Sequence, residues 1–253
     1  MILKRLLVFL YPLLFFLGIE LLFYNINYIV LILIVLSILL LITLKLLIKD
    51  KFFSWDFWGF VAMSFLFFYV AVCFLFIISS DVFRHSLIIV FIFILGIYLE
   101  SIFSFYYQSW QYQPNTFENF SSFLTLLIFF LAVTNLYAFN VFLNFPIWVL
   151  SLILVVICSL LIFLAYWTNK IKSKLKFIYL IIFNVIIIEF FWAIAFLPAS
   201  FYINSAIITI VFFLLWELFK AKLNEKWQNK IIWRLGIISG ILLLIIIISS
   251  RWS

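Results

Sequence analysis

Residues 6–44 read LLVFLYPLLFFLGIELLFYNINYIVLILIVLSILLLITL, an apolar run broken by only a few polar side chains. As a single helix this run would extend roughly 60 Å, at about 1.5 Å per residue. The hydrocarbon core of a bilayer is only about 30 Å thick and is crossed by about 20 apolar residues. The run must therefore turn, and Asn25-Ile26-Asn27 is the natural corner. We predict two membrane-spanning helices on either side of it.

The composition of the whole chain extends this prediction. Of its 253 residues 70% are hydrophobic and 10% are charged, whereas soluble domains have about 45–50% apolar and about 25% charged residues. A soluble fold could not hide so much apolar surface, because a large share of any folded surface meets water. We therefore expect an all-α, polytopic integral membrane helix bundle. Residues 1–253 are expected to form a single transmembrane domain with no soluble domain.

The basic residues predict how many spans there are and how they are oriented. They form four clusters, which are Lys4/Arg5, Lys45/Lys49/Lys51, Lys170/Lys172/Lys174/Lys176 and Lys220/Lys222/Lys226/Lys230/Arg234. Loops rich in Lys and Arg face the cytoplasm, so even numbers of spans should separate these clusters. This predicts about nine helices (range eight to ten), at about 6–24, 28–48, 57–79, 82–107, 119–140, 145–168, 177–197, 201–219 and 231–249. The N-terminus is then cytoplasmic and the C-terminus outside a bacterial-type plasma membrane, with only Arg84 and Arg251 among the basic residues on the outer side.

Several functional classes are disfavoured. The net charge of +7 comes from the clusters beside the spans, where anionic lipid is the expected partner rather than nucleic acid. The two cysteines, Cys73 and Cys158, lie within apolar runs, and His85 is the only histidine. We therefore expect no disulfide framework, no metal site and no cofactor. The N-terminus resembles a signal peptide but lacks a small-residue cleavage site, so we expect a retained first span. Familiar nucleotide-binding and hydrolase motifs are absent, which favours a protein that is not an enzyme.

Four glutamates fall within the predicted spans, where an ionisable group costs about 2.5–3.5 kcal/mol at the centre of a helix. Glu189 is nearest the midplane, and Glu100 is a few residues past the middle of its span. Glu20 and Glu217 are within about a turn of an interface, where water can solvate them. No Lys or Arg within the spans can pair with Glu189 or Glu100. We expect Glu189 to face the protein interior, as part of a proton relay, a cation site or a structural hydrogen bond.

Polar and small side chains recur at helical spacing on several spans, and these stripes are expected to face one another. They have two interpretations. Small and hydroxyl residues let membrane helices pack closely and form hydrogen bonds. Alternatively, the stripes line a polar substrate site. The candidates for that site are Glu189, Trp192, Glu100, Asn135, Asn184 and Thr209.

Two further features suit binding. Asp81, Arg84 and His85 lie in an outer loop and suit either the binding of a lipid headgroup or polar substrate, or the capping of the next helix by Ser80 or Asp81. Together with Glu20 and Glu217 they are secondary site candidates. Gly236-x-x-x-Gly240 in the last span suits a close helix contact, with a second copy or another membrane protein as the partner.

Three functions remain open at this stage. The leading hypothesis is a small permease, transporter component or channel-type subunit for a small or apolar solute, with Glu189 in a membrane-embedded polar site. The first alternative is an intramembrane enzyme acting on a lipid or polyprenyl-linked substrate. The second is a structural subunit that assembles with a larger membrane complex.

Overall fold

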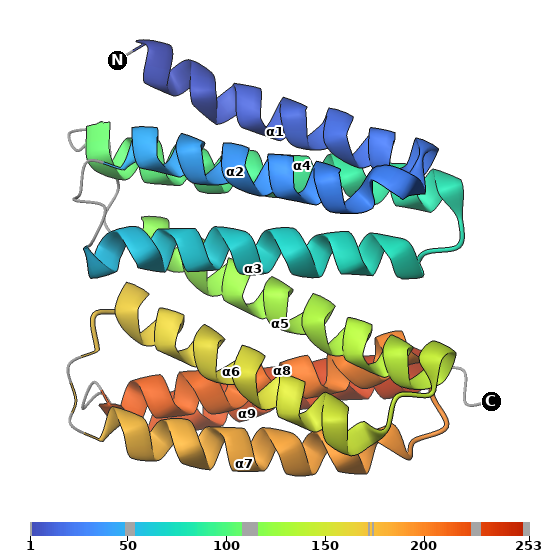
Figure 1. The fold of residues 1–253 in the computed structure, drawn as a ribbon. Helices are drawn as coiled ribbons and strands as arrows, with labels where there is room; N and C mark the ends of the chain where they lie inside the picture. The colour runs from blue at the N-terminus through green and yellow to red at the C-terminus, as the bar shows by residue number, and fades with distance from the viewer. Residues whose placement is uncertain are drawn as a thin grey trace. The chain divides into compact units, whose positions relative to one another are not determined.

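The structure, a computed structural model, describes residues 2–48, 54–107, 116–171, 173, 175–223 and 229–249. Every regular element in these residues is helical (Figure 1). The helices are α1 (Ile2–Tyr24), the short 3-10 helix η1 (Ile26–Tyr28), α2 (Ile29–Leu47), α3 (Trp55–Ile77), α4 (Asp81–Tyr107), α5 (Thr116–Leu143), α6 (Ile147–Thr168), α7 (Lys176–Ala195), α8 (Phe201–Leu223) and α9 (Asn229–Ser249).

The predicted fold class is confirmed. Within the described residues, eight helices are long and apolar enough to cross a membrane, while the apolar part of α9 counted in the same way, Trp233–Ile246, is shorter. Each of the nine predicted spans coincides with one of the helices α1 to α9. The ends differ by a few residues, as at α8, which was expected to end at Phe219 and ends at Leu223. The chain is therefore an all-α, multi-pass protein of membrane type.

The predicted turns have clear local causes. The Asn25 side chain accepts a hydrogen bond from the Asn27 backbone N–H at 3.2 Å and so caps η1 at the expected corner. Between α5 and α6, Asn144 adopts a left-handed backbone with φ of 53°, a conformation in which asparagine is enriched. Pro146 then precedes the first residue of α6. Between α7 and α8 the helix ends at Ala195, shortly before Pro198.

Some residues used in the topology prediction cannot be compared with the structure. Lys49, Lys51, Lys172, Lys174, Lys226 and Arg251 lie outside the described residues. The predicted orientation in the membrane stays a prediction.

Internal contacts divide the chain into two compact units, Met1–Leu124 and Thr125–Ser253, with the boundary within α5. In unit 1, α1 packs against both α2 and α4, and α3 packs against α2 and α4. Aromatic side chains fill the spaces between these helices, as where Phe15 of α1 meets Phe68 of α3 with ring centroids 5.6 Å apart. The prediction of a single domain stays a prediction.

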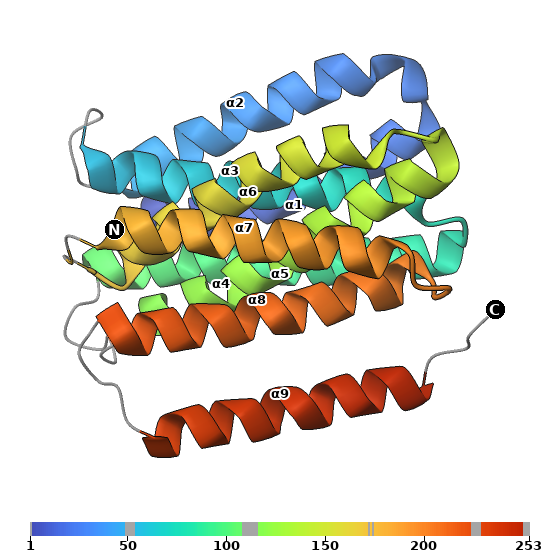
Figure 2. The same cartoon turned by 90° about the horizontal axis from the view of Figure 1, so that it is seen from below.

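In unit 2, α7 packs against α6 and α8, and α8 also packs against α9 (Figures 1 and 2). The core again relies on aromatic contacts. Phe212 of α8 stacks on Phe129 of α5 with ring centroids 4.0 Å apart, and Phe183 of α7 meets Phe212 edge-on. The second, C-terminal part of α5 therefore packs beside α7 and α8.

Gly18 allows α1 and α2 to approach closely, which gives a first prediction. A Cβ atom at Gly18 would lie 2.8 Å from Leu36 Cδ1, whereas one at Gly96 would lie 3.8 Å from Pro12 Cγ. Both glycines are helical, so the gain in helix propensity on mutation to alanine is similar at both. The free energy of unfolding of Gly18→Ala should be about 1–3 kcal/mol below that of Gly96→Ala, because only Gly18→Ala overpacks the core.

Unfolding of the purified variants by titration with a denaturing detergent measures this difference. Equal stabilities of the two variants would mean that Leu36 adjusts without strain.

Candidate functional site

Glu189, the principal candidate, lies on the outward surface of α7. Its side chain is exposed and forms no hydrogen bond or ion pair with the described residues. Exposed residues at steps of three or four along this surface include Ile178, Ile182, Val185, Trp192 and Phe196. We call this set, with Glu189, the outward stripe of α7. The prediction that Glu189 faces the protein interior is wrong.

The inward side of α7 explains this orientation. Its buried residues are Phe183, Asn184, Ile187, Phe191 and Ile194. At 3.6 residues per turn, Asn184 and Glu189 point in directions about 140° apart, so both cannot be buried in one contact. The helix buries Asn184 together with two phenylalanines, and Glu189 is left on the opposite side.

Asn184 and Trp192 join α7 to α6. The Asn184 side-chain N–H donates to Ser159 Oγ at 3.0 Å, and the Trp192 indole N–H donates to Ser151 Oγ at 2.6 Å. The two bonds have the register of an antiparallel pair. They are eight residues apart along each helix, about 12 Å. These two candidates therefore act in helix packing, the first of the two interpretations of the polar stripes.

Asn135 and Thr209 belong to the helices that meet in the core of unit 2. Asn135 of α5 is buried, and Thr209 Oγ1 donates to the Ser205 carbonyl one turn earlier in α8. A direct hydrogen bond between α5 and α8 involves a residue that was not among the candidates. Thr134 Oγ1 donates to Ser205 Oγ at 2.7 Å. Tyr137 was also missed, and its hydroxyl donates to the Phe191 carbonyl of α7 at 2.9 Å.

Glu100 lies in unit 1 and has a basic partner, contrary to expectation. Arg5 Nη2 is 3.5 Å from Glu100 Oε1, and Lys4 Nζ donates to the Tyr107 hydroxyl at 2.7 Å. These contacts exist because α1 and α4 pack together, although they are far apart in the sequence. The clusters of basic residues predict how many spans there are, but not which helices pack against each other. The contact between Arg5 and Glu100 could therefore not be predicted.

Four secondary candidates come together at the opposite end of the same two helices. His85 Nδ1 is 2.8 Å from Glu20 Oε1, which joins α4 to α1. Arg84 Nη1 is 2.9 Å from Asp81 Oδ1, and Arg84 Nη2 donates to the Ile78 carbonyl at 2.9 Å. The Arg84 guanidinium also lies over the Phe23 ring. Asp81 is the first residue of α4, where a carboxylate interacts favourably with the helix dipole.

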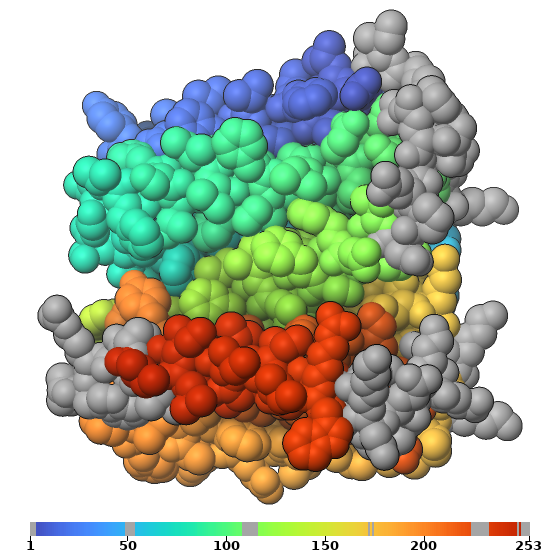
Figure 3. Space-filling model, turned by 180° about the vertical axis from the view of Figure 1, so that it is seen from behind, coloured from blue at the N-terminus to red at the C-terminus, as the bar shows by residue number. Residues whose placement is uncertain are grey.

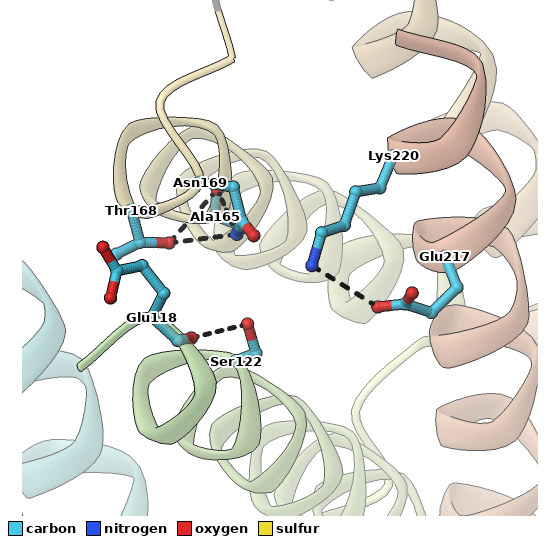
Figure 4. Close-up of polar contacts among 7 residues, drawn as sticks. All are labelled: Glu118, Ser122, Ala165, Thr168, Asn169, Glu217 and Lys220. Atoms are coloured by element: carbon cyan, nitrogen blue, oxygen red, sulfur yellow. Dashed lines mark hydrogen bonds and ion pairs between the residues drawn. The ribbon is translucent and has the colours of Figure 1, made fainter. Parts of the chain in front are cut away.

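Glu217, the remaining secondary candidate, lies near the end of α8. Figure 4 shows its carboxylate directed toward Lys220 one turn later, with 3.9 Å between Oε1 and Nζ. The same view shows the end of α6, where Asn169 Nδ2 donates to the Ala165 carbonyl at 2.9 Å. Both contacts are local, each within one turn of its own helix.

Gly236 and Gly240 lie on α9, whose side chains cover part of one face of unit 2 (red in Figure 3). A Cβ atom added at either glycine would meet nothing within 4 Å. Contact between α9 and α8 therefore does not require these glycines. Their use by a partner stays a prediction.

The candidates thus lie at separate places. Asn135, Asn184, Trp192 and Thr209 lie in helix contacts of unit 2, Glu189 lies on its outward surface, and Glu100 lies in unit 1. Among the described residues, no group of three or more His, Cys, Asp or Glu side chains could hold a metal ion. Glu189 is the candidate whose carboxyl group has no hydrogen-bond or ion-pair partner among the described residues.

Comparison with known proteins found no matching family model, no matching curated protein and no matching solved structure.

The hydrogen bonds between α6 and α7 give a second prediction. A double-mutant cycle with Ser151→Ala and Trp192→Phe should give a coupling energy of about 0.6 kcal/mol, with an upper bound of about 1.7 kcal/mol, as for hydrogen bonds between membrane helices. Detergent unfolding of the four proteins of the cycle measures this energy. The matched control combines Ser159→Ala with Trp192→Phe. These residues share no hydrogen bond in the structure, so their effects should add. Similar coupling in both cycles would argue against the Ser151–Trp192 bond.

Proposed function

We propose that this chain is a subunit of a membrane protein assembly and that it binds a neighbouring protein through the outward stripe of α7. The observation that supports this proposal is the exposed carboxyl group of Glu189 among apolar side chains. This exposed carboxyl group supports assembly among the three functions that the sequence left open, because a neighbouring helix could offer it a hydrogen bond.

The position of Glu189 along α7 supports this proposal. The 20 residues of α7 extend about 30 Å, the thickness of the hydrocarbon core. Glu189 is 13 residues after Lys176 and six before Ala195, so it lies about 20 Å from one end and about 9 Å from the other. With α7 as a span of this length, its carboxyl group would lie within the hydrocarbon rather than among the headgroups.

Lipid tails cannot stabilise a carboxyl group at this depth. An ionised group costs about 2.5–3.5 kcal/mol near the centre of a membrane helix, and a protonated one still has a donor and an acceptor without partners. A neighbouring helix that offers a hydrogen bond would remove this cost. Such contacts drive helix association in membranes, where the hydrophobic effect does not favour one helix contact over another.

The permease hypothesis required Glu189 to face a polar interior. Because the Glu189 side chain faces outward, it does not support the permease hypothesis. It supports the assembly hypothesis instead. A permease and a lipid-modifying enzyme stay predictions from the sequence.

Photocrosslinking tests the proposal. A photoreactive amino acid at Val185, one turn from Glu189 on the outward stripe, should give a discrete protein adduct in the membranes of the cell that makes this chain. The substitution Glu189→Leu should remove most of the adduct, because the partner loses its hydrogen bond. Gel electrophoresis measures the yield.

The control carries the same photoreactive amino acid at Ile34, which is exposed on α2 in unit 1. Its adducts should not respond to Glu189→Leu. If Val185 gives only lipid adducts, α7 faces lipid and the assembly proposal is wrong.

A further inference from the structure

We infer that the partner at Glu189 is a different protein, one whose transmembrane helix carries a Lys or Arg side chain at the depth of this carboxyl group. This inference rests on the proposed function and adds the chemistry of the partner to it.

The chain itself offers no donor to Glu189 among the described residues. Its neighbours one turn away on the stripe are Val185, which is apolar, and Trp192. The indole N–H of Trp192 is already bonded to Ser151 at 2.6 Å. The carboxyl group therefore needs a partner from another molecule.

Among the described residues of unit 2, a second copy in the same orientation offers no basic side chain near the depth of Glu189. The basic residues of unit 2 whose side chains are described are Lys170, Lys176, Lys220, Lys222 and Arg234. They lie at the end of α6, the start of α7, the end of α8 and the first turns of α9. All of these positions are at the end of unit 2 opposite to the end that Glu189 is near (Figure 1).

Basic side chains of unit 1 already have partners, as where Arg84 contacts Asp81 and His85 contacts Glu20. An inverted copy would contradict the clustering of lysines that predicts a single orientation. Charge complementarity therefore favours a different chain.

A basic side chain is the best match for this carboxyl group. Attraction between opposite charges is much stronger in hydrocarbon than in water, because little screens it. A Lys or Arg within a partner's span is itself costly there. Contact between the two stabilises both helices at once and selects the depth at which they meet.

Defined peptides test this inference without knowledge of the natural partner. The purified full-length chain is reconstituted in phosphatidylcholine vesicles with synthetic Leu/Ala transmembrane peptides, and resonance energy transfer reports association. One peptide carries a single Lys about 9 Å from the hydrocarbon edge nearest Ala195, a second carries it at the midplane, and a third has Leu at both positions.

The first peptide should associate at least tenfold more strongly than the other two. Glu189→Leu should abolish this preference, and Glu189→Gln should reduce it, because the amide keeps a hydrogen bond but no charge. Glu217→Gln is the matched control, since Glu217 is paired with Lys220 near the end of α8, and it should leave the preference unchanged.

Equal association of the three peptides would overturn the inference. So would energy transfer between copies of the chain that depends on Glu189 and exceeds transfer to the lysine peptide, because it identifies the partner as a second copy. In both cases a Glu189-dependent adduct from Val185 in cells would leave the assembly proposal intact. Loss of that adduct overturns the assembly proposal whatever the peptides do.

Discussion

The bilayer leaves each polar group of this protein dependent on the chain or on a neighbour, and this constraint shapes the structure. Helices satisfy backbone N–H and C=O groups within the hydrocarbon. Side chains have no such general solution, and several polar side chains among the described residues lie in helix contacts. Ser151 with Trp192, Ser159 with Asn184 and Thr134 with Ser205 are examples within unit 2. Each bond fixes a register between helices whose apolar surfaces alone would slide past one another.

Charged groups in unit 1 follow the same rule at the helix ends. α1 and α4 are joined by Arg5 with Glu100 near one end and by Glu20 with His85 near the other. Partly exposed pairs of this kind contribute little free energy, about 0–1 kcal/mol each. Their effect is on geometry, because two contacts at opposite ends fix both the direction and the register of the pair. The aromatic side chains between the helices then stabilise the arrangement that these contacts define.

The number and positions of the helices were predictable because they depend on the lengths of the apolar runs, which can be read directly from the sequence. The turn at Asn25 and the break before Pro198 follow from local residue chemistry. The direction of each side chain was not predictable in this way. α7 is apolar on almost all sides, so the sequence does not show which of Asn184 and Glu189 is buried. The partnership of Arg5 with Glu100 depends on which helices are neighbours, and hydropathy carries no information about that.

Glu189 is therefore informative because it departs from the rule that the other polar residues follow. α7 already has a polar inward contact in Asn184, and the same helix bears phenylalanines that fill the core. Rotating it to bury Glu189 would expose Asn184 and break its bond to Ser159. Rotation would also remove the phenylalanines of α7 from the core, so packing keeps Asn184 inside and leaves Glu189 on the outward side. A partner that bonds to Glu189, as proposed, would stabilise the observed orientation further, and the packing of α7 would then be coupled to assembly.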